Sequence, residues 1–467
     1  MILEGSYPYV RGGVSSWTHD LIRANPQHEY VLWVIGANAE QRGKFKYDLP
    51  ANVVEVREVF LDDALHLAAE RKKTRFSEEE IEAMRQLMLC ENPDWNVLFE
   101  LYNDKKVNVM SFLRSEKLME ILLDVCEKNY PFVQFAEFFH TIRSMFLPIL
   151  YMIGQDAPEA EVYHATATGY GGLLGALGSW RFKRPLVVTE HGIYTREREE
   201  EILRAKWLSP NFRQQWIKMF YMLSSCAYGH AFSVTALFNR YSQAQQELGA
   251  PSERCSVIAN GIRLERFADI PPKEDNGYID ITAVVRIHPI KDIKTLIYAF
   301  YALKQRVENA RLHILGDTDD PQYREECLAL IEHLNIQDIF LTGNVDVVKY
   351  LEFTDFTVLS SISEGQPLAV LESLAAGRPA VTTDVGCCRD LLYGADAEDK
   401  FGDAGILVPP MHAYAMTNAM ELLATDVKLR REMAEAGVSR VRKYYVHKDM
   451  ICKYNENYEK VVAQWQA

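Results

Sequence analysis

The sequence lacks the features of several large protein classes. No apolar run approaches the ~18 residues needed to cross a bilayer, and the N-terminus shows no basic-then-apolar signal pattern. The eight cysteines are scattered without a Cys-x-x-Cys pair, which disfavours a disulfide framework and a zinc site. A basic excess is also missing, because 51 Lys+Arg stand against 65 Asp+Glu, giving a net charge of −14. We therefore expect a reduced, cytoplasmic setting and no nucleic-acid partner.

What is present indicates a globular protein of two or three domains. The chain has 467 residues, of which 48% are hydrophobic and 25% charged, enough for sizeable cores. Short β-branched runs alternate with helical patterns, which is typical of parallel α/β sheets. In the second half this pattern predicts a doubly wound domain. Its expected strands are 279–286, 311–315, 338–341, 356–360, 379–383 and 405–408, and its expected helices are 291–308, 322–334, 347–353 and 367–377.

The first half repeats the same alternation, with one interruption. Its expected strands are 1–3, 30–35, 53–56, 161–165, 186–189, 231–235 and 256–258. Only three residues precede Glu4, so we expect a short first strand, trimmed or alternatively started, that weakens its edge of the sheet. Residues 64–155 are rich in Leu, Met, Glu, Lys and Phe with helical periodicity, which predicts a helical insertion.

The domain boundaries follow from these patterns. Residues 268–277 cluster prolines, charge and glycine, as a linker does. We predict an N-terminal domain over 1–268 and a C-terminal domain over 269–448. The final segment, 449–467, has apolar residues in helical spacing. The pattern alone is equally compatible with a helix packed on its own domain and with one that completes the N-terminal domain, and we predict the latter.

Two glutamates are the most informative feature of the chain. Glu364 precedes Pro367 in Ser-Glu-Gly-Gln-Pro-Leu-Ala-Val-Leu-Glu-Ser-Leu-Ala-Ala-Gly-Arg-Pro, and Glu372 lies about one and a half turns into the following helix. A helix N-terminus attracts phosphate, and carboxylates on either side of it can hold hydroxyls. Two solvated glutamates on a surface helix are the alternative. The Gly-Gln-Pro-Leu insert favours a site for a nucleotide sugar.

Other loops at predicted strand ends add candidate binding groups. Gly12 and Gly13 lie between the first strand and a helix, where paired glycines allow a ligand close to the backbone; a structural turn is the alternative. The pattern is not Gly-x-Gly-x-x-Gly, which disfavours a dinucleotide site. His191 follows the buried run Leu-Val-Val-Thr, although a lone loop histidine is more often a surface residue. Arg286 and Lys291 place two cations in the turn after another strand.

The glutamate segment resembles the E-x7-E motif of retaining glycosyltransferases of the GT-B fold, the large family 4 that includes glycogen and sucrose synthases. The loop Glu-Gly-Ser-Tyr-Pro-Tyr-Val-Arg-Gly-Gly-Val-Ser-Ser-Trp and the later Thr-Glu-His-Gly-Ile-Tyr-Thr-Arg-Glu-Arg are similar to the Pel exopolysaccharide branch (PelF-type) of that family. The resemblance covers essentially the whole chain. It implies an α/β GT-B fold with two doubly wound Rossmann-like domains facing a cleft.

The resemblance also implies roles for individual residues. Glu364 would face the donor sugar, Glu372 would hold the ribose, and the cation pair would bind the diphosphate without a metal. His288 replaces a residue that is often small in relatives. The expected catalytic residues are His191, Arg286, Lys291 and Glu364, and the expected nucleotide-sugar-binding residues are Gly12, Gly13, Gly316, Val345, Gly365, Gln366, Pro367, Leu368 and Glu372.

A metal site is the rival interpretation of one short motif. Asp317-Thr318-Asp319 has the Asp-x-Asp pattern that holds Mg²⁺ or Mn²⁺ beneath a diphosphate in the other glycosyltransferase fold. Three letters occur often by chance, and the sequence around them is that of a polar turn before a helix. We therefore expect no metal and no cofactor.

The expected function is transfer of a sugar from a UDP-sugar, such as UDP-glucose, to a growing exopolysaccharide or another carbohydrate acceptor with retention of configuration. Two alternatives stay open: a UDP-sugar epimerase and a non-catalytic nucleotide-sugar-binding protein of the same fold. The Pel resemblance further implies inner-membrane polysaccharide-synthesis partners and a location peripheral to the inner membrane.

Overall fold

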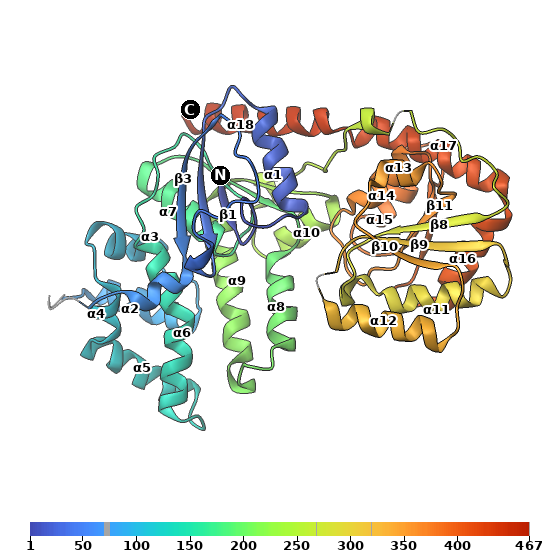
Figure 1. Ribbon diagram of the computed structural model, residues 1–467. Coiled ribbons are helices and arrows are strands. Elements are labelled where there is room, and N and C mark those ends of the chain that lie inside the picture. The colour runs from blue at the N-terminus through green and yellow to red at the C-terminus, as the bar shows by residue number, and fades with distance from the viewer. Residues whose placement is uncertain (70–74, 268, 319, 467) are drawn as a thin grey trace. The chain divides into compact units, whose positions relative to one another are not determined.

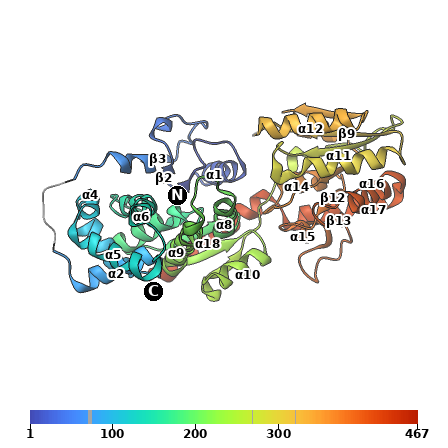
Figure 2. The same ribbon diagram turned by 90° about the horizontal axis from the view of Figure 1, so that it is seen from below.

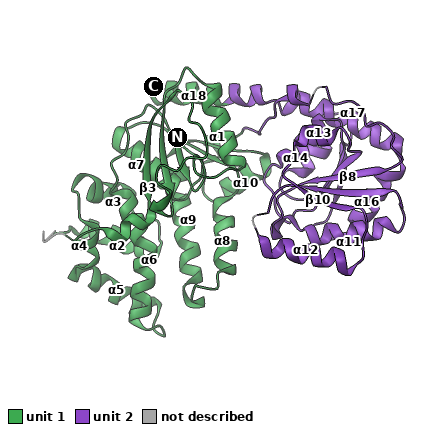
Figure 3. Cartoon of the chain, in the orientation of Figure 1, with its two compact units in different colours: residues 1–257, 454–467 green, residues 258–453 purple. Residues whose placement is uncertain are grey.

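The computed structural model describes residues 1–69, 75–267, 269–318 and 320–466. They form two compact units, residues 1–257 with 454–467 (unit 1) and residues 258–453 (unit 2), coloured separately in Figure 3. The predicted boundary lies later in the chain, and Ala268, where the predicted linker begins, lies outside the described residues. No helix of the described part of the chain is both long and apolar enough to cross a membrane.

Unit 1 is built on a parallel sheet of seven strands in the order β3-β2-β1-β4-β5-β6-β7 (Figure 1). The predicted strands are all present: β1 Ile2–Glu4, β2 Tyr30–Gly36, β3 Val53–Phe60, β4 Tyr163–Ala165, β5 Leu186–Glu190, β6 Ala231–Ala236 and β7 Cys255–Val257. The short strand β1 lies between β2 and β4, so the expectation that it weakens an edge of the sheet is wrong. In a doubly wound sheet the chain starts at the centre and works outwards in both directions.

The edge strand β3 is longer than its predicted range, 53–56. The prediction ended there because Arg57 and Glu58 interrupt the apolar run. The strand continues to Phe60 because it pairs along its whole length with β2 while its other side is a sheet edge, where polar side chains reach water. An edge strand therefore follows a weaker apolar pattern than the buried strands.

Helices cover the sheet of unit 1. The glycine-rich helix α7 packs against β1 and β4. A Cβ added to Gly178 would lie 2.4 Å from the ring of Tyr163, which explains why this helix carries glycine where it meets the sheet. The other helices outside the insertion are α1 Gly13–Ala24, α7 Tyr170–Phe182, α8 Tyr194–Arg204, α9 Arg213–His230 and α10 Asn239–Glu247, with 3₁₀ turns η1 Ala39–Gln41, η4 Pro210–Phe212 and η5 Ser252–Arg254.

The region predicted as a helical insertion is helical. Figures 1 and 2 show α2, α4, α5 and α6 gathered at one side of unit 1, and their apolar faces continue the core of the sheet. Its elements are the 3₁₀ helix η2 Leu61–His66, α2 Glu78–Leu89, α3 Trp95–Phe99, the π-helical turn η3 Glu100–Asp104, α4 Val109–Leu113, α5 Glu116–Asn129 and α6 Phe135–Ile153.

Unit 2 is a second doubly wound sheet, with the order β10-β9-β8-β11-β12-β13. The predicted strands are confirmed within about two residues at each end: β8 Ile279–Val284, β9 Ala310–Leu315, β10 Ile339–Gly343, β11 Phe356–Leu359, β12 Ala380–Thr383 and β13 Gly405–Val408. The helices are α11 Ile293–Lys304, α12 Pro321–His333, α13 Val347–Leu351, α14 Leu368–Ala375, α15 Cys388–Tyr393, α16 Ala413–Thr425 and α17 Val427–Tyr444, with 3₁₀ turns η6 Leu264–Arg266 and η7 Pro289–Lys291.

The last helix, α18 (His447–Gln466), begins in unit 2 and ends in unit 1. Its side chains from residue 454 onwards contact unit 1 through specific bonds. The hydroxyl of Tyr458 lies 2.7 Å from Nδ1 of His164, and Nε1 of Trp465 donates to the carbonyl of Lys183 at 2.9 Å. The chain end thus helps to complete the fold of unit 1.

In both sheets the strand order reverses direction beside the first strand of the unit. The reversal lies between β1 and β4 in unit 1 and between β8 and β11 in unit 2. Ligands of open α/β sheets bind outside the carboxyl ends of the strands at such reversals, because the crossover helices diverge there. The loops after these strands therefore define where a site should lie in each unit.

Candidate functional site

In unit 2 the loops after β8 and β11 meet at the strand reversal. The amide of Ile362 donates to the carbonyl of Ile290 at 2.8 Å, and the hydroxyl of Ser360 donates to the carbonyl of Lys291 at 2.8 Å. Two segments about seventy residues apart in sequence are thereby fixed to each other. These are the segments that carry Lys291 and Glu364.

Lys291 and Glu364 form a close ion pair. Lys291 Nζ donates to Glu364 Oε1 at 2.5 Å, and the side chains are only 19% and 12% exposed. The hydroxyl of Ser361 donates to the same oxygen at 2.5 Å. A charge-assisted pair in partial burial holds both side chains in one geometry. The structure thus brings together two of the four predicted catalytic residues. It also adds Ser361, whose only signal in the sequence is its position three residues before Glu364.

The backbone between Glu364 and α14 is held from two sides. The amide of Cys387 donates to the carbonyl of Gly365 at 3.0 Å, and Gly386, with φ +55°, approaches so closely that an added Cβ would lie 2.2 Å from that carbonyl. The side chain of Gln366 accepts from the amide of Asn260 at 2.7 Å and donates to its carbonyl at 3.2 Å. Gln366 is therefore a structural clamp through its side chain, which leaves its backbone for a ligand.

Helix α14 begins where the sequence predicted, with Pro367 as its N-cap and Leu368 as its first residue. No side chain caps the first turn, and no acidic residue lies in it. The first amides of a helix need acceptors from outside the helix, and the macrodipole favours a negatively charged one. The start of α14 can therefore bind phosphate.

Glu372 lies one turn further along α14, largely buried. Burial raises the pKa of this carboxyl, and the positive charge of Arg266 opposes the rise. A buried carboxylate that stabilises a fold normally accepts several hydrogen bonds, and Glu372 has no such set of donors among the described residues. A buried acid next to an uncapped helix start is suited to accept hydrogen bonds from ligand hydroxyls.

The remaining predicted residues of unit 2 surround this centre at different distances. Arg286 is exposed just after β8. Gly316 follows β9 with φ +141°, and an added Cβ would lie 2.1 Å from the carbonyl of Val285, so the close approach of the segment after β8 already explains this glycine. Val345 is half-buried after the edge strand β10, with β9 between that strand and β8.

The rival metal motif is described only in part, because Asp319 lies outside the described residues. The carboxylate of Asp317 accepts from the amide of Thr318 at 2.8 Å, and the hydroxyl of Thr318 donates to the carbonyl of Asp320 at 3.0 Å. These bonds are those of a polar turn. Among the residues that the structure describes, no group of three or more His, Cys, Asp or Glu is arranged to hold a metal ion.

In unit 1 the strand reversal carries the Gly12-Gly13 loop. Gly12 is the N-cap of α1 with extended backbone, φ 177°, and α1 has neither a side-chain cap nor an acid in its first turn. A Cβ added to either glycine would meet no atom within 4 Å. Neither backbone conformation nor packing therefore demands glycine at Gly12. Open space before uncapped amides suits close approach by an anion.

His191 follows β5 and packs against α1. Its ring lies 4.6 Å from the ring of Trp17, edge to face. Burial lowers the pKa of His191 to about 4, so the imidazole is neutral at pH 7. His191 Nε2 and Trp17 Nε1 are both buried and have no hydrogen-bond partner among the described residues. The N-terminal sequence motif indicates no role for Trp17, and this contact places it beside His191.

The neighbouring Glu190 has a structural environment instead. Its carboxylate accepts hydrogen bonds from Tyr228 at 2.6 Å, Gln245 at 3.0 Å and the amide of Tyr194 at 3.2 Å. Burial raises the pKa of Glu190 while these donors oppose the rise. The residue fixes the loop from which His191 projects.

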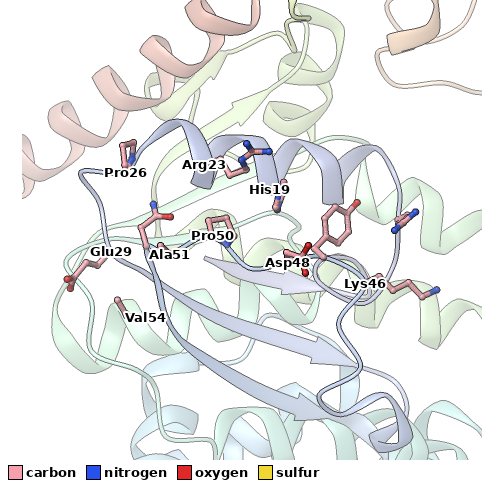
Figure 4. A pocket seen from close by; sticks show the side chains of 12 residues that line it. His19, Arg23, Pro26, Glu29, Lys46, Asp48, Pro50, Ala51 and Val54 are labelled. Atoms are coloured by element: carbon pink, nitrogen blue, oxygen red, sulfur yellow. The ribbon is translucent and has the colours of Figure 1, made fainter. Parts of the chain in front are cut away.

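A pocket of about 930 Å³ lies beside α1 in unit 1 (Figure 4). Figure 4 shows His19 and Arg23 on the helix, facing Lys46, Asp48 and the segment from Pro50 to Val54. Arg11, next to Gly12, also lines it, as does Tyr47, whose ring lies 5.2 Å from that of His19. Mixed charges beside an aromatic ring suit a polar ligand with several hydroxyls. No residue pattern in the sequence indicated this pocket.

Comparison with known proteins agrees with this architecture. Residues 1–253 match the family described as Domain of unknown function (DUF3492), and residues 279–426 match Glycosyl transferases group 1. The chain is 24% identical to the MMP alpha-(1->4)-mannosyltransferase of Mycolicibacterium hassiacum over 286 residues, which is 60% of this chain and 66% of that protein. It is 28% identical over 205 residues to a Campylobacter jejuni N-acetylgalactosaminyltransferase named for a diphospho-undecaprenol acceptor, covering 43% of this chain and 52% of that one. The matched regions thus span between half and two thirds of these relatives.

Solved structures match over almost the full length. Anabaena HepE in complex with UDP and glucose superposes with a TM-score of 0.60 at 14% identity, covering 98% of this chain and 99% of that one. The sucrose-phosphate synthase of Thermosynechococcus elongatus gives 0.61 at 16% identity, with 99% of both chains covered. The fold is therefore GT-B, as the family resemblance implied. Since the first family match covers more than half of the chain, the protein belongs to the family described as Domain of unknown function (DUF3492), with a Glycosyl transferases group 1 region in unit 2.

Proposed function

We propose that the protein is a retaining glycosyltransferase that takes a sugar from a UDP-sugar, without a metal ion, and transfers it to a carbohydrate acceptor of exopolysaccharide synthesis. The Lys291–Glu364 pair at the strand reversal of unit 2, beside the uncapped start of α14, is the observation that carries the proposal. Cations and helix amides at one point suit a diphosphate, and carboxylates on both sides of it suit sugar and ribose hydroxyls.

In this proposal unit 2 binds the donor. Arg286, Lys291 and the amides at the start of α14 hold the diphosphate and stabilise the charge that develops on UDP as it departs. Glu364 orients the sugar and Glu372 accepts hydrogen bonds from the ribose hydroxyls. Gly316 and Val345 belong to the nucleotide end of the same site.

The proposed reaction is a displacement on one face of the sugar. The bond between the anomeric carbon and the UDP oxygen breaks, and a bond from that carbon to the acceptor oxygen forms on the same side. The proton of the acceptor hydroxyl passes to the departing phosphate oxygen. Glu364 is not a covalent nucleophile in this scheme, because it is engaged by Lys291 and Ser361 and acts as a positioning group.

Unit 1 contributes groups to the sugar and the acceptor. His191, neutral at pH 7 with an unpartnered Nε2, can hydrogen bond a sugar hydroxyl. The amides after Gly12 and Gly13 offer a further anion contact. The pocket beside α1 offers a polar surface for the acceptor.

The finer assignments rest on resemblance. The HepE structures carry UDP with glucose and UDP-glucose in their descriptions, which favours a UDP-sugar here. The Pel branch, an exopolysaccharide acceptor, a cytoplasmic location and inner-membrane synthesis partners follow from the N-terminal motif. The names of relatives include mannosyl-, N-acetylgalactosaminyl- and glucosyl-transferring enzymes, so the transferred sugar must be measured.

Calorimetric titration of the full chain with UDP-sugars and GDP-sugars, followed by product analysis with and without a carbohydrate acceptor, tests the proposal. We expect one UDP-sugar to bind most tightly and its sugar to appear on the acceptor. An altered UDP-sugar formed without acceptor would establish the epimerase instead. Binding without any turnover would establish a non-catalytic sensor.

A further inference from the structure

Two loops of unit 1 meet at one end of the unit. The α5–α6 loop (residues 130–134) and the α8–α9 loop (residues 205–212) are joined by aromatic contact, because the rings of Tyr130 and Phe212 lie 5.4 Å apart. The hydroxyl of Tyr130 also donates to Gln215 Oε1 at 3.0 Å. Figure 1 shows the lower ends of α6, α8 and α9 pointing the same way. The two loops therefore form one surface.

This surface exposes large apolar side chains to water. Phe132 is 100% exposed, Trp207 71% and Leu203 53%, and we name these three residues the aromatic tip. Beneath them, Phe212 is fully buried and supports both loops. Single exposed apolar residues are common, but two exposed aromatic rings on adjoining loops indicate a surface that meets an apolar phase or partner.

The α8–α9 loop and helix α9 carry basic and no acidic residues, unlike the chain as a whole. Residues 202–246 contain no Asp or Glu, although the chain has 65 of them. The same stretch carries Arg204, Lys206, Arg213 and Lys218 close to the tip. On the preceding helix, Glu200 pairs with Arg204 at 3.3 Å and Glu201 with Arg198 at 2.9 Å. Glu127 and Glu137 flank the other loop. The α8–α9 side is thus the basic side of the surface.

We propose that the aromatic tip docks the protein on an anionic lipid surface. Exposed Trp and Phe on two adjoining loops, with Leu in the last turn of α8 and lysine and arginine nearby, are suited to the headgroup boundary, where rings enter the apolar layer and cations face lipid phosphates. Basic charge on the loop that carries Trp207 favours a surface with anionic headgroups over a protein partner. The inference stands on unit 1 alone and does not depend on the proposed transfer reaction.

The position of the tip gives the docking a direction. Helix α8 starts three residues after His191, and its 11 residues cover about 16 Å to the tip. The tip therefore extends beyond the carboxyl ends of the strands, which is also the end of the sheet where His191 lies. Docking would turn that edge of unit 1 towards the lipid, where an acceptor attached to a membrane could reach it.

Vesicle sedimentation of the full chain tests the proposal. We expect the protein to sediment with vesicles of phosphatidylcholine and phosphatidylglycerol in equal parts, and at least about tenfold less with phosphatidylcholine alone. The double variant Phe132→Ser, Trp207→Ser should lose at least about tenfold in binding to the anionic vesicles, since it lacks the two rings that would enter the lipid. The matched control Phe353→Ser, Tyr414→Ser changes rings that are 62% and 65% exposed in unit 2 and should bind as the parent does.

Charge and insertion can be separated by two further measurements. Lys206→Glu with Lys218→Glu should weaken binding at least about fivefold, and salt should weaken the parent in the same way. Brominated lipid should quench part of the tryptophan fluorescence of the parent. In Trp207→Phe this quenching should be lost, while the fluorescence of the other tryptophans is unchanged. Failure of the parent to sediment, or equal binding by the double variant, would overturn the proposal. So would a double variant that loses self-association in light scattering while vesicles bind neither protein.

Discussion

The two ends of the sheet in unit 2 hold buried carboxylates in opposite ways. At the amino ends of the strands, Asp280 is surrounded by donors. At the carboxyl ends, Glu372 is largely buried without a comparable set. Both carboxyls belong to the same unit of one chain. The difference in their hydrogen-bonding partners therefore reflects what each end of the sheet is used for.

Asp280 is the centre of an ion network. Its carboxylate accepts from Arg311 at 2.6 Å and His313 at 3.0 Å, and it pairs with Lys273 at 2.7 Å. Lys273 also pairs with Asp355 at 2.5 Å. Burial alone would raise the pKa of Asp280, but the hydrogen bonds outweigh it and hold the pKa well below its usual range. This end of the sheet is built for stability.

At the other end the balance is reversed. Burial raises the pKa of Glu372, and only the more distant charge of Arg266 opposes it. A fold that tolerates a costly buried acid at a strand reversal gains nothing in stability from it. The comparison therefore assigns ligand binding to the carboxyl ends, and each of the following changes tests one side of it.

The largest expected effect lies at the Lys291–Glu364 pair. Lys291→Ala and Glu364→Ala should each abolish measurable transfer, a loss of at least about 10²–10³-fold in kcat, because charge stabilisation or sugar orientation is removed. The melting temperature should change little. Steady-state kinetics on purified, folded variants is the measurement.

Lys294→Ala is the matched control for that loss. Lys294 lies three residues further on and pairs with Glu326 at 2.7 Å on the exposed surface. It should keep near-parental activity. The double variant of Lys291 and Glu364 should lose no more than the worse single variant, because the two residues act as a unit. Near-normal transfer by either single variant would remove the assignment.

The second effect should appear in stability and not in catalysis. Asp280→Asn removes the buried charge that pairs with Arg311 and Lys273 and accepts from His313, and it should lower the free energy of unfolding by about 3 kcal/mol at pH 7. Its pKa is depressed in the folded state, so its contribution is present above pH ~3.9 and is lost as pH falls further. Urea titrations should show the difference between parent and variant shrinking below about pH 4. An unchanged urea midpoint would break the comparison.

The sequence predicted the strands well because buried parallel strands are continuous apolar runs bounded by turns. The predicted β3 was too short, because charged residues interrupt the apolar pattern of this edge strand. The prediction placed β1 at an edge of the sheet, because no local sequence pattern determines strand order. Glu364, Glu372 and Lys291 were found from motif and helix signals. The clamp between Gln366 and Asn260, the support by Gly386 and the network of Asp280 were not, because each joins segments distant in sequence.

The third change replaces the carboxylate of Glu372 with a neutral amide. Glu372→Gln removes a buried charge whose raised pKa makes the folded state bind its proton more readily than the unfolded state, so the charge costs stability as pH rises through the ordinary range of Glu. The variant should be as stable as the parent or about 0.5–1 kcal/mol more stable at pH 7. Its affinity for UDP should fall about tenfold, because hydrogen bonds to a charged acceptor are lost.

Thermal unfolding and titration with UDP measure these two outcomes on the same sample. Glu432→Gln, on the exposed side of α17 and 3.7 Å from Lys428, is the control and should change neither quantity. A variant of Glu372 that is clearly less stable, with unchanged UDP affinity, would show that this residue supports the fold.

The smallest effect extends the comparison to a pair of buried histidines in unit 1. His164 has both ring nitrogens satisfied, Nδ1 by Tyr458 at 2.7 Å and Nε2 by Thr189 at 2.8 Å, whereas Nε2 of His191 has no partner among the described residues. His164→Ala should therefore lower the melting temperature more than His191→Ala does. Because one hydrogen bond to an uncharged group contributes about 1 kcal/mol, His191→Ala should lower kcat about fivefold.

The pH profile distinguishes this role of His191 from acid–base catalysis. Burial lowers its pKa to about 4, so the ring is neutral on both sides of pH 6.5 and activity should show no step from His191 between pH 5 and 8. The depressed pKa also means that its contribution to stability declines as pH falls from 6.5 towards 4, since the unfolded chain takes up the proton first. An activity step near pH 6.5 that disappears in His191→Ala would show a histidine that titrates during the reaction, and the analogy with Glu372 would then fail.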